Sequence, residues 1–67
     1  MMRPGDLLQD IEDGSLAIVV DVEWAEYYDT PIRYKLLFDT GHVIWLNAAI
    51  IQYYFEIISE GTKDEGG

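Results

Sequence analysis

Few side chains in this sequence have the chemistry of a catalytic nucleophile or base. The one histidine is His42, the serines are Ser15 and Ser59, and cysteine is absent. Nucleophilic catalysis needs a nucleophile, a base and an orienting group within hydrogen-bond reach. His42 stands beside a glycine-containing turn without such partners, so we interpret it as a polar residue that flanks the turn. We expect no catalytic residue, no cofactor and no enzymatic activity.

Carboxylates are abundant, and some of them are closely spaced. Residues 10–14, Asp-Ile-Glu-Asp-Gly, have the composition of a calcium-binding loop. An EF-hand loop places oxygen ligands at positions one, three and five before a glycine at position six. Gly14 falls at position five of this segment, so the spacing fails. We expect a solvated acidic turn and no metal site.

The segment 23–29 combines three acids with three aromatic residues, Trp24, Tyr27 and Tyr28. In one interpretation Trp24 and one tyrosine close the end of the folded core, and the acids keep the loop soluble. In the other, the segment is an aromatic patch with an acidic rim, suited to a basic or arginine-bearing partner through stacking and ion pairs. Large aromatic residues in a loop of a small domain are frequent binding elements. Both interpretations remain open at this point.

The length and the charge limit the remaining possibilities. A chain of 67 residues allows one small domain, and 13 acidic against 4 basic residues give a net charge of -9. This charge argues against nucleic-acid and anionic-membrane partners, which select Lys and Arg. The charge is uneven: residues 1–31 carry -7, whereas residues 32–58 are neutral. With apolar runs too short to span a bilayer and no secretory signal pattern, we expect a soluble, cytoplasmic protein.

Alternation of apolar and polar residues predicts two long strands, over 16–24 and 32–38, after a short strand at about 6–11. The expected apolar faces consist of Leu16, Ile18, Val20, Val22 and Trp24 in the first long strand and Ile32, Tyr34, Leu36 and Phe38 in the second.

The segment 38–42 predicts a tight turn. A two-residue loop would require a positive φ angle at Thr40, which a β-branched residue resists. A three-residue loop asks this only of Gly41, so we favour it. It places Val43 and Trp45 on the outside of the sheet, and the two-residue loop would reverse this orientation.

The segment that follows is ambiguous. Asn47 is a candidate cap of one helical turn, and the apolar residues of 50–58 fit either a helix or a strand. Because Ile, Tyr and Phe prefer strands, we expect one short helical turn and then a strand over about 53–57. At least one ring of the run 53–55, Tyr-Tyr-Phe, must then lie outside the core. Residues 59–67 are expected to form a disordered acidic tail.

Five antiparallel strands with a short helical turn before the last predict an all-β fold, closed into a small barrel that leaves no exposed edge. The chain is too short to bury a large core and has no disulfide, so we expect a homo-oligomer. Apolar residues outside the sheet, in the neutral half of the chain, are the candidate interface. This expected oligomer interface consists of Leu37, Val43 and Tyr54.

The segments 4–8, Pro-Gly-Asp-Leu-Leu, and 13–19, Asp-Gly-Ser-Leu-Ala-Ile-Val, resemble the opening of SH3-like barrels of the KOW and Tudor-like kind. The later run Tyr34-x-Leu36-x-Phe38-x-x-Gly41 and the pair Trp45-Leu46 are also similar to these barrels. The chain as a whole resembles short uncharacterised proteins of tailed bacteriophages. The resemblance implies a five-stranded SH3-like barrel over residues 1–58 and, for barrels that bind peptides, a face of exposed aromatic residues. The residues that match this face are Trp24, Tyr27, Tyr28 and Trp45.

These observations lead to one main hypothesis and two alternatives. The main hypothesis is a non-enzymatic protein-interaction module that self-associates through residues 32–58 and presents its acidic-aromatic loop to a protein partner. The alternatives are an acidic decoy that imitates nucleic acid and a minor structural component of the virion. The phage resemblance implies the cytoplasm of an infected host cell, or the virion, as the location.

Overall fold

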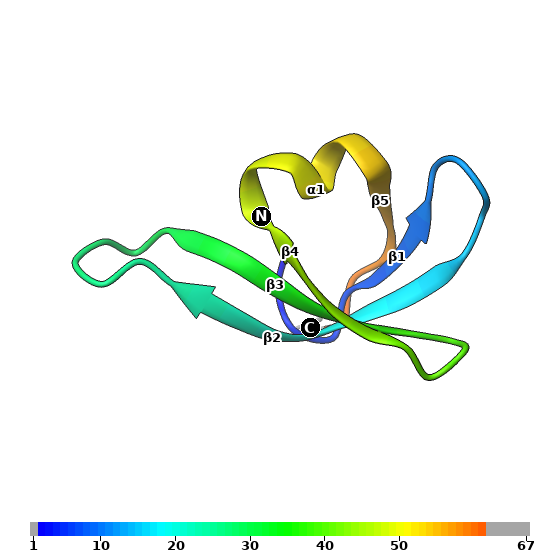
Figure 1. Cartoon of the computed structure of the whole chain (residues 1–67), viewed down its shortest axis with the longest axis horizontal. Helices are drawn as coiled ribbons and strands as arrows, with labels where there is room; N and C mark the ends of the chain where they lie inside the picture. The colour runs from blue at the N-terminus through cyan, green and yellow to red at the C-terminus, as the bar shows by residue number, and fades with distance from the viewer. Residues whose placement is uncertain (1, 62–67) are drawn as a thin grey trace, which may run out of the picture.

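A computed structural model describes residues 2–61, which form one antiparallel sheet and one short helix (Figure 1). In chain order the elements are β1 (Leu7–Asp10), β2 (Leu16–Trp24), β3 (Pro31–Phe38), β4 (Val43–Asn47), α1 (Ala48–Tyr54) and β5 (Phe55–Ser59). The strand order is β4-β3-β2-β1-β5. This confirms the predicted five-stranded antiparallel fold with a short helix before the last strand. Within residues 2–61 the outer strands β4 and β5 do not pair with each other, so the predicted closure into a barrel is not confirmed.

The core lies between the sheet and α1, which crosses one face of the sheet (Figure 1). Its fully buried aliphatic side chains come from the three strands at the centre of the sheet order, with Leu8 from β1, Val19 from β2 and Leu36 from β3. Ile51 closes the core from α1. No residue between 23 and 33 belongs to this core. The outer half of the β2–β3 hairpin is therefore held by its ladder rather than by core packing.

The predicted inner face of β2 is wrong for the first half of the strand and for Trp24 at its end, which is 47% exposed and outside the core. Ala17 and Val19 are buried, whereas Val20 is exposed. The pairing of β2 with β3 shifts register between Val19 and Asp21, so Val20 is an extra residue in the ladder. Such a bulge reverses the side-chain alternation, which brings Val22 back to the core face. The run 16–20 is apolar on both faces, so its alternation could not reveal the bulge.

The β3–β4 turn follows the predicted three-residue loop. Gly41 has a φ angle of +92° and its N–H donates to the carbonyl of Phe38 at 2.9 Å. The resulting register places Leu36 opposite Ile44 and Tyr34 opposite Leu46, as expected. Because register fixes which face each side chain takes, the predicted exposure of Val43 and Trp45 is confirmed.

The helix is longer than predicted, and the last strand therefore begins later than predicted. The Asn47 side chain accepts a hydrogen bond from the Ala49 N–H at 2.7 Å, so the predicted cap is present. The helix continues through Tyr54 because it buries Ile51 against the sheet, a gain that outweighs the strand preference of its aromatic residues. Phe55 is buried at the start of β5, while Tyr53 and Tyr54 are exposed.

Both ends of the described chain meet at a buried carboxylate. Asp6 is 1% exposed, and one of its oxygens accepts the Arg3 N–H at 2.9 Å while the other accepts the Gly61 N–H at 3.1 Å. A side chain on Gly61 would overlap the backbone of Gly5, so this approach requires glycine. Ser59 and Gly61 are thus part of the folded structure, and the rest of the predicted tail, 62–67, lies outside the described residues.

We predict that Asp6→Ala lowers the free energy of unfolding by about 1–3 kcal/mol, because two backbone donors lose a buried acceptor. Urea denaturation followed by circular dichroism measures this change. The matched control is Asp39→Ala, which removes the same charge from an exposed position and should stay within about 0.5 kcal/mol of the parent. Equal losses in the two variants would contradict the role of Asp6.

Burial of Tyr34 raises the pKa of its hydroxyl above the ordinary value of 10.0, and the nearby Asp6 carboxylate raises it further. A folded-state pKa above the unfolded one gives stability that is complete below pH 10 and is lost as the pH rises through the folded value. We expect the free energy of unfolding to fall at alkaline pH. In Tyr34→Phe, measured over the same series, this part of the decline should disappear.

Candidate functional site

The segment that joins β2 to β3 projects from the molecule as the end of a long hairpin (Figure 1). We call residues 24–30 the hairpin tip. The Ala25 N–H donates to the Thr30 carbonyl at 2.8 Å and closes the loop. Beyond this bond the backbone has no regular secondary structure, and the side chains of residues 26–29 are exposed to solvent.

The aromatic residues of the hairpin tip are exposed. Tyr27 is 81% exposed, Tyr28 is 73% exposed and Trp24 is 47% exposed. None of them joins the core, which does not favour the interpretation that Trp24 and a tyrosine close it. Glu26 and Asp29 are exposed beside them, and the tip contains no basic residue. The tip is therefore an accessible aromatic surface with negative charge.

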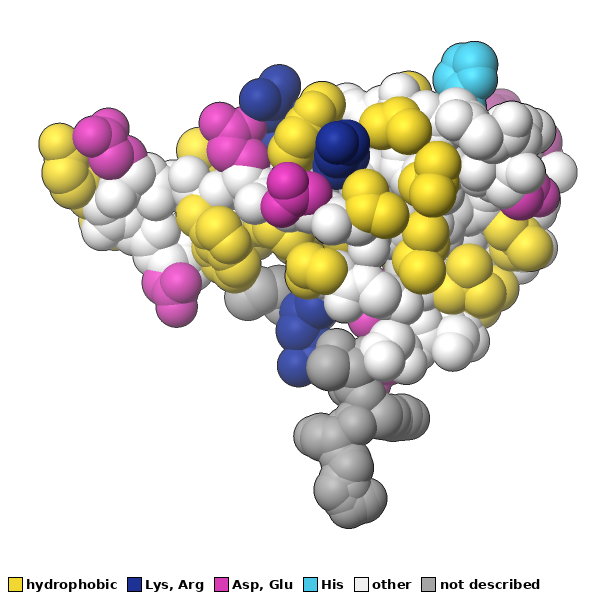
Figure 2. All heavy atoms as spheres, turned by 90° about the horizontal axis from the view of Figure 1, so that it is seen from below, with side chains coloured by type: hydrophobic (Ala, Val, Ile, Leu, Met, Phe, Trp, Pro, Cys, Tyr) yellow, Lys and Arg dark blue, Asp and Glu magenta, His cyan; other side chains and the backbone are white. Residues whose placement is uncertain are grey.

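A second apolar surface lies on the face of the sheet opposite α1, which we call the outer sheet face. Leu7, Ile18, Leu37 and Val43 face one another in register across four strands and form one row. A hollow of about 280 Å³ beside the row is lined mainly by Leu7, Leu16, Ile18 and Leu37. Figure 2 shows hydrophobic side chains spread over this face with a few charged groups between them.

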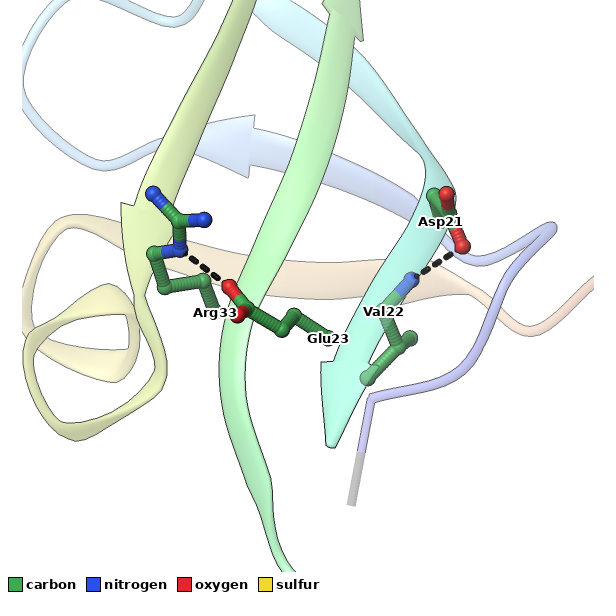
Figure 3. A network of polar contacts seen from close by, with 4 residues as sticks. All are labelled: Asp21, Val22, Glu23 and Arg33. Atoms are coloured by element: carbon green, nitrogen blue, oxygen red, sulfur yellow. Dashed lines mark hydrogen bonds and ion pairs between the residues drawn. The ribbon is translucent and has the colours of Figure 1, made fainter. Parts of the chain in front are cut away.

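Trp45 lies on the outer sheet face within a charged network. The guanidinium carbon of Arg33 stands 5.0 Å from the centre of the Trp45 ring, and Lys35 Nζ stands 5.9 Å from it. Arg33 also donates to the carboxylate of Glu23 across the β2–β3 ladder (Figure 3). Trp45 is 40% exposed, and two cations lie near its ring.

The structure separates the four predicted partner-binding residues into two places. Trp45 is opposite Lys35, which is four residues along β3 from Pro31 at the base of the hairpin tip. At the rise of an extended strand this is about 13 Å. Trp24, Tyr27 and Tyr28 share the hairpin tip, whereas Trp45 belongs to the outer sheet face.

The three predicted interface residues are also divided. Leu37 and Val43 are direct neighbours on the outer sheet face. Tyr54 ends α1 on the other side of the sheet, where it lines a separate hollow with Ile11 and Tyr53. Sequence reasoning missed Ile18, which completes the row beside Leu37. Only the bulge at Val20 reveals its orientation, and the alternation of the strand gave no signal of it.

The carboxylates of Asp10 and Asp13 accept hydrogen bonds within the acidic turn. One Asp10 oxygen accepts the N–H groups of Glu12 and Asp13, and an Asp13 oxygen accepts the Ser15 N–H. Hydrogen bonds from the backbone and the side chain of Ser15 lower the pKa of the Asp13 carboxyl. Within residues 2–61 no three His, Cys, Asp or Glu side chains are grouped to hold a metal ion. No helix in the same range is long and apolar enough to cross a bilayer.

Comparison with protein-family models, with curated proteins and with solved structures found no match to this chain. The surfaces must therefore be interpreted from their own geometry and charge.

We predict that Glu23→Gln lowers the free energy of unfolding by less than about 1 kcal/mol, because both partners of its ion pair with Arg33 are half-exposed. Denaturation at low and high salt measures the effect, and the difference from the parent should shrink as salt screens the pair. A loss well above this value that persists in high salt would contradict a surface role for the network.

Proposed function

We propose that the protein is a non-enzymatic interaction module whose hairpin tip binds a cationic segment of a protein partner. The observation that carries the proposal is the high exposure of Tyr27 and Tyr28 at the end of a projecting hairpin. Exposed aromatic residues on a loop that a sheet holds in place are typical of recognition surfaces.

The chemistry of the tip favours an arginine-bearing ligand. A guanidinium stacks on a tyrosine face and pairs with a carboxylate in the same contact. Glu26 and Asp29 lie within two residues of the exposed tyrosines, and the nearest base in the hairpin, Arg33, is already paired with Glu23. The tip thus offers aromatic faces and unneutralised carboxylates together.

The topology is compatible with the proposed SH3-like family, since five antiparallel strands and a short helix before the last are what that resemblance implies. The resemblance to bacteriophage proteins adds a host or virion protein as the kind of partner. Fold alone does not define a ligand, so the proposal depends on the tip.

The test is a titration with a fluorescently labelled oligoarginine peptide at low ionic strength. We expect binding that weakens with salt and that falls by about fivefold to thirtyfold in the double variant Tyr27→Ser/Tyr28→Ser, since each exposed cation–π contact contributes about 0.5–1 kcal/mol. Amide shifts in a nitrogen-15 spectrum should concentrate in residues 24–30.

The matched control is Tyr53→Ser, which removes a tyrosine of similar exposure, 70%, from α1 and should leave binding unchanged. Equal effects of the control and the double variant would contradict the proposal. So would peptide-induced shifts centred on the acidic turn at 10–13, which would indicate general attraction to carboxylates.

A decoy that imitates nucleic acid is the second candidate, favoured by the charge of -7 in residues 1–31. It predicts that binding to the basic groove of a nucleic-acid enzyme is displaced by DNA and weakened steeply by salt. Because such a groove recognises charge, binding of the decoy should not change in Tyr27→Ser/Tyr28→Ser. This result separates the second candidate from the first.

A further inference from the structure

The strand β4 is one edge of the sheet, and within residues 2–61 it pairs only with β3. The Phe38 N–H donates to the His42 carbonyl at 2.8 Å. Hydrogen-bonded pairs recur at every second residue of an antiparallel ladder. The pairs Leu36–Ile44 and Tyr34–Leu46 are therefore of the same kind, and the peptide groups of Ile44 and Leu46 face β3. Those of Val43 and Trp45 point away from β3, toward the free edge.

This edge lacks the features that usually prevent pairing between molecules. Native edge strands are protected by charge, proline or a bulge. β4 contains no charged residue and no proline, and its register with β3 has no shift. The other edge, β5, carries Glu56 and pairs with β1 through a register shift.

The charge distribution favours a second copy of the chain at this edge. A protein with a net charge of -9 repels its own copies over most of its surface. Residues 43–55 contain no acidic or basic residue, so copies that meet along β4 bring their least repulsive segments together. A cationic partner would instead be drawn to the carboxylates elsewhere.

We propose that two copies pair β4 against β4 in antiparallel fashion and join their sheets into one. A strand that pairs with its own copy satisfies two-fold symmetry, the commonest arrangement of protein dimers. The main-chain groups of Val43 and Trp45 gain partners across the seam, and the two outer sheet faces lie on the same side of the joined sheet.

Pairing along the edge is favoured over stacking of two outer sheet faces. Stacking would bury the charged groups around Trp45, namely Arg33, Lys35 and Glu23, at a large cost in desolvation. Edge pairing leaves these groups in water. It is independent of ligand binding at the hairpin tip, which lies at the far end of the β2–β3 hairpin (Figure 1).

The test is sedimentation of the whole chain from about 10 µM to about 1 mM, where the parent should pass from monomer to dimer. Val43→Pro should weaken self-association by about tenfold or more, because it removes one seam donor from each copy. The substitution costs no bond to β3, and proline is tolerated as the first residue of a strand. Val43→Ala keeps the donor while shortening the side chain, so it should still dimerise.

Two further measurements keep the proposal testable if the proline variant does not fold. Val43→Lys places a charge at the edge and should also give a monomer. Amide exchange should slow at Val43 and Trp45 as the concentration of the parent protein rises, whereas exchange at Ile44 and Leu46 should not change with concentration.

A parent protein that stays monomeric at the highest concentration would overturn the proposal. A dimer that survives both Val43→Pro and Val43→Lys, with the Val43 and Trp45 amides still exchanging fast, would overturn it in favour of another surface. Pairing of β4 with a strand of a different protein, with no dimer of this chain, would overturn the choice of occupant. Oligoarginine binding to the Val43→Lys monomer tests the hairpin tip separately.

Discussion

The Asp6 carboxylate holds the two ends of the fold together. It accepts the N–H of Arg3 and the N–H of Gly61, which are far apart in the sequence, while its own main-chain carbonyl accepts the Val19 N–H of β2 at 3.0 Å. A buried carboxylate is costly unless its oxygens are satisfied by donors. The chain therefore gains this stabilisation only when the N-terminal turn, β2 and the segment after β5 are all in place. The contact fastens the segment before β1 to the segment after β5, and these two strands also pair with each other.

The sequence was most informative where one residue type decided between two backbones. Gly41 made the three-residue turn the less strained choice, and the register of β4 followed from it. The prediction of the inner face of β2 was wrong for a physical reason. Leu16 through Val20 are apolar on both sides of the strand, so either orientation of the strand buries apolar atoms. The predicted length of α1 was too short because the strand preference of its residues is outweighed by the packing of Ile51 on the sheet. Preference at single residues gives way to such burial.

The sequence indicated which residues belong to the candidate surfaces, but it did not indicate which of these residues lie together. The sequence left open whether both tyrosines of the hairpin tip are exposed, and the structure exposes both. The separation of Trp45 from the hairpin tip could not be predicted, since it depends on how far β3 runs between them. Tyr54 was grouped with Leu37 and Val43 by neutrality along the sequence, but α1 carries it to the opposite side of the sheet. Charge along a chain locates a surface only after the register of its strands is known.

The absence of residues 23–33 from the core has a consequence for how the sequence can vary. The outer part of the β2–β3 hairpin is an arm whose residues are constrained by their ladder and not by the shape of a cavity. Changes of length or composition in the arm leave the packing of Leu8, Val19 and Leu36 untouched. Segments of this kind accept insertions at low cost in stability. The same body can therefore carry an arm of different reach while its core packing stays the same.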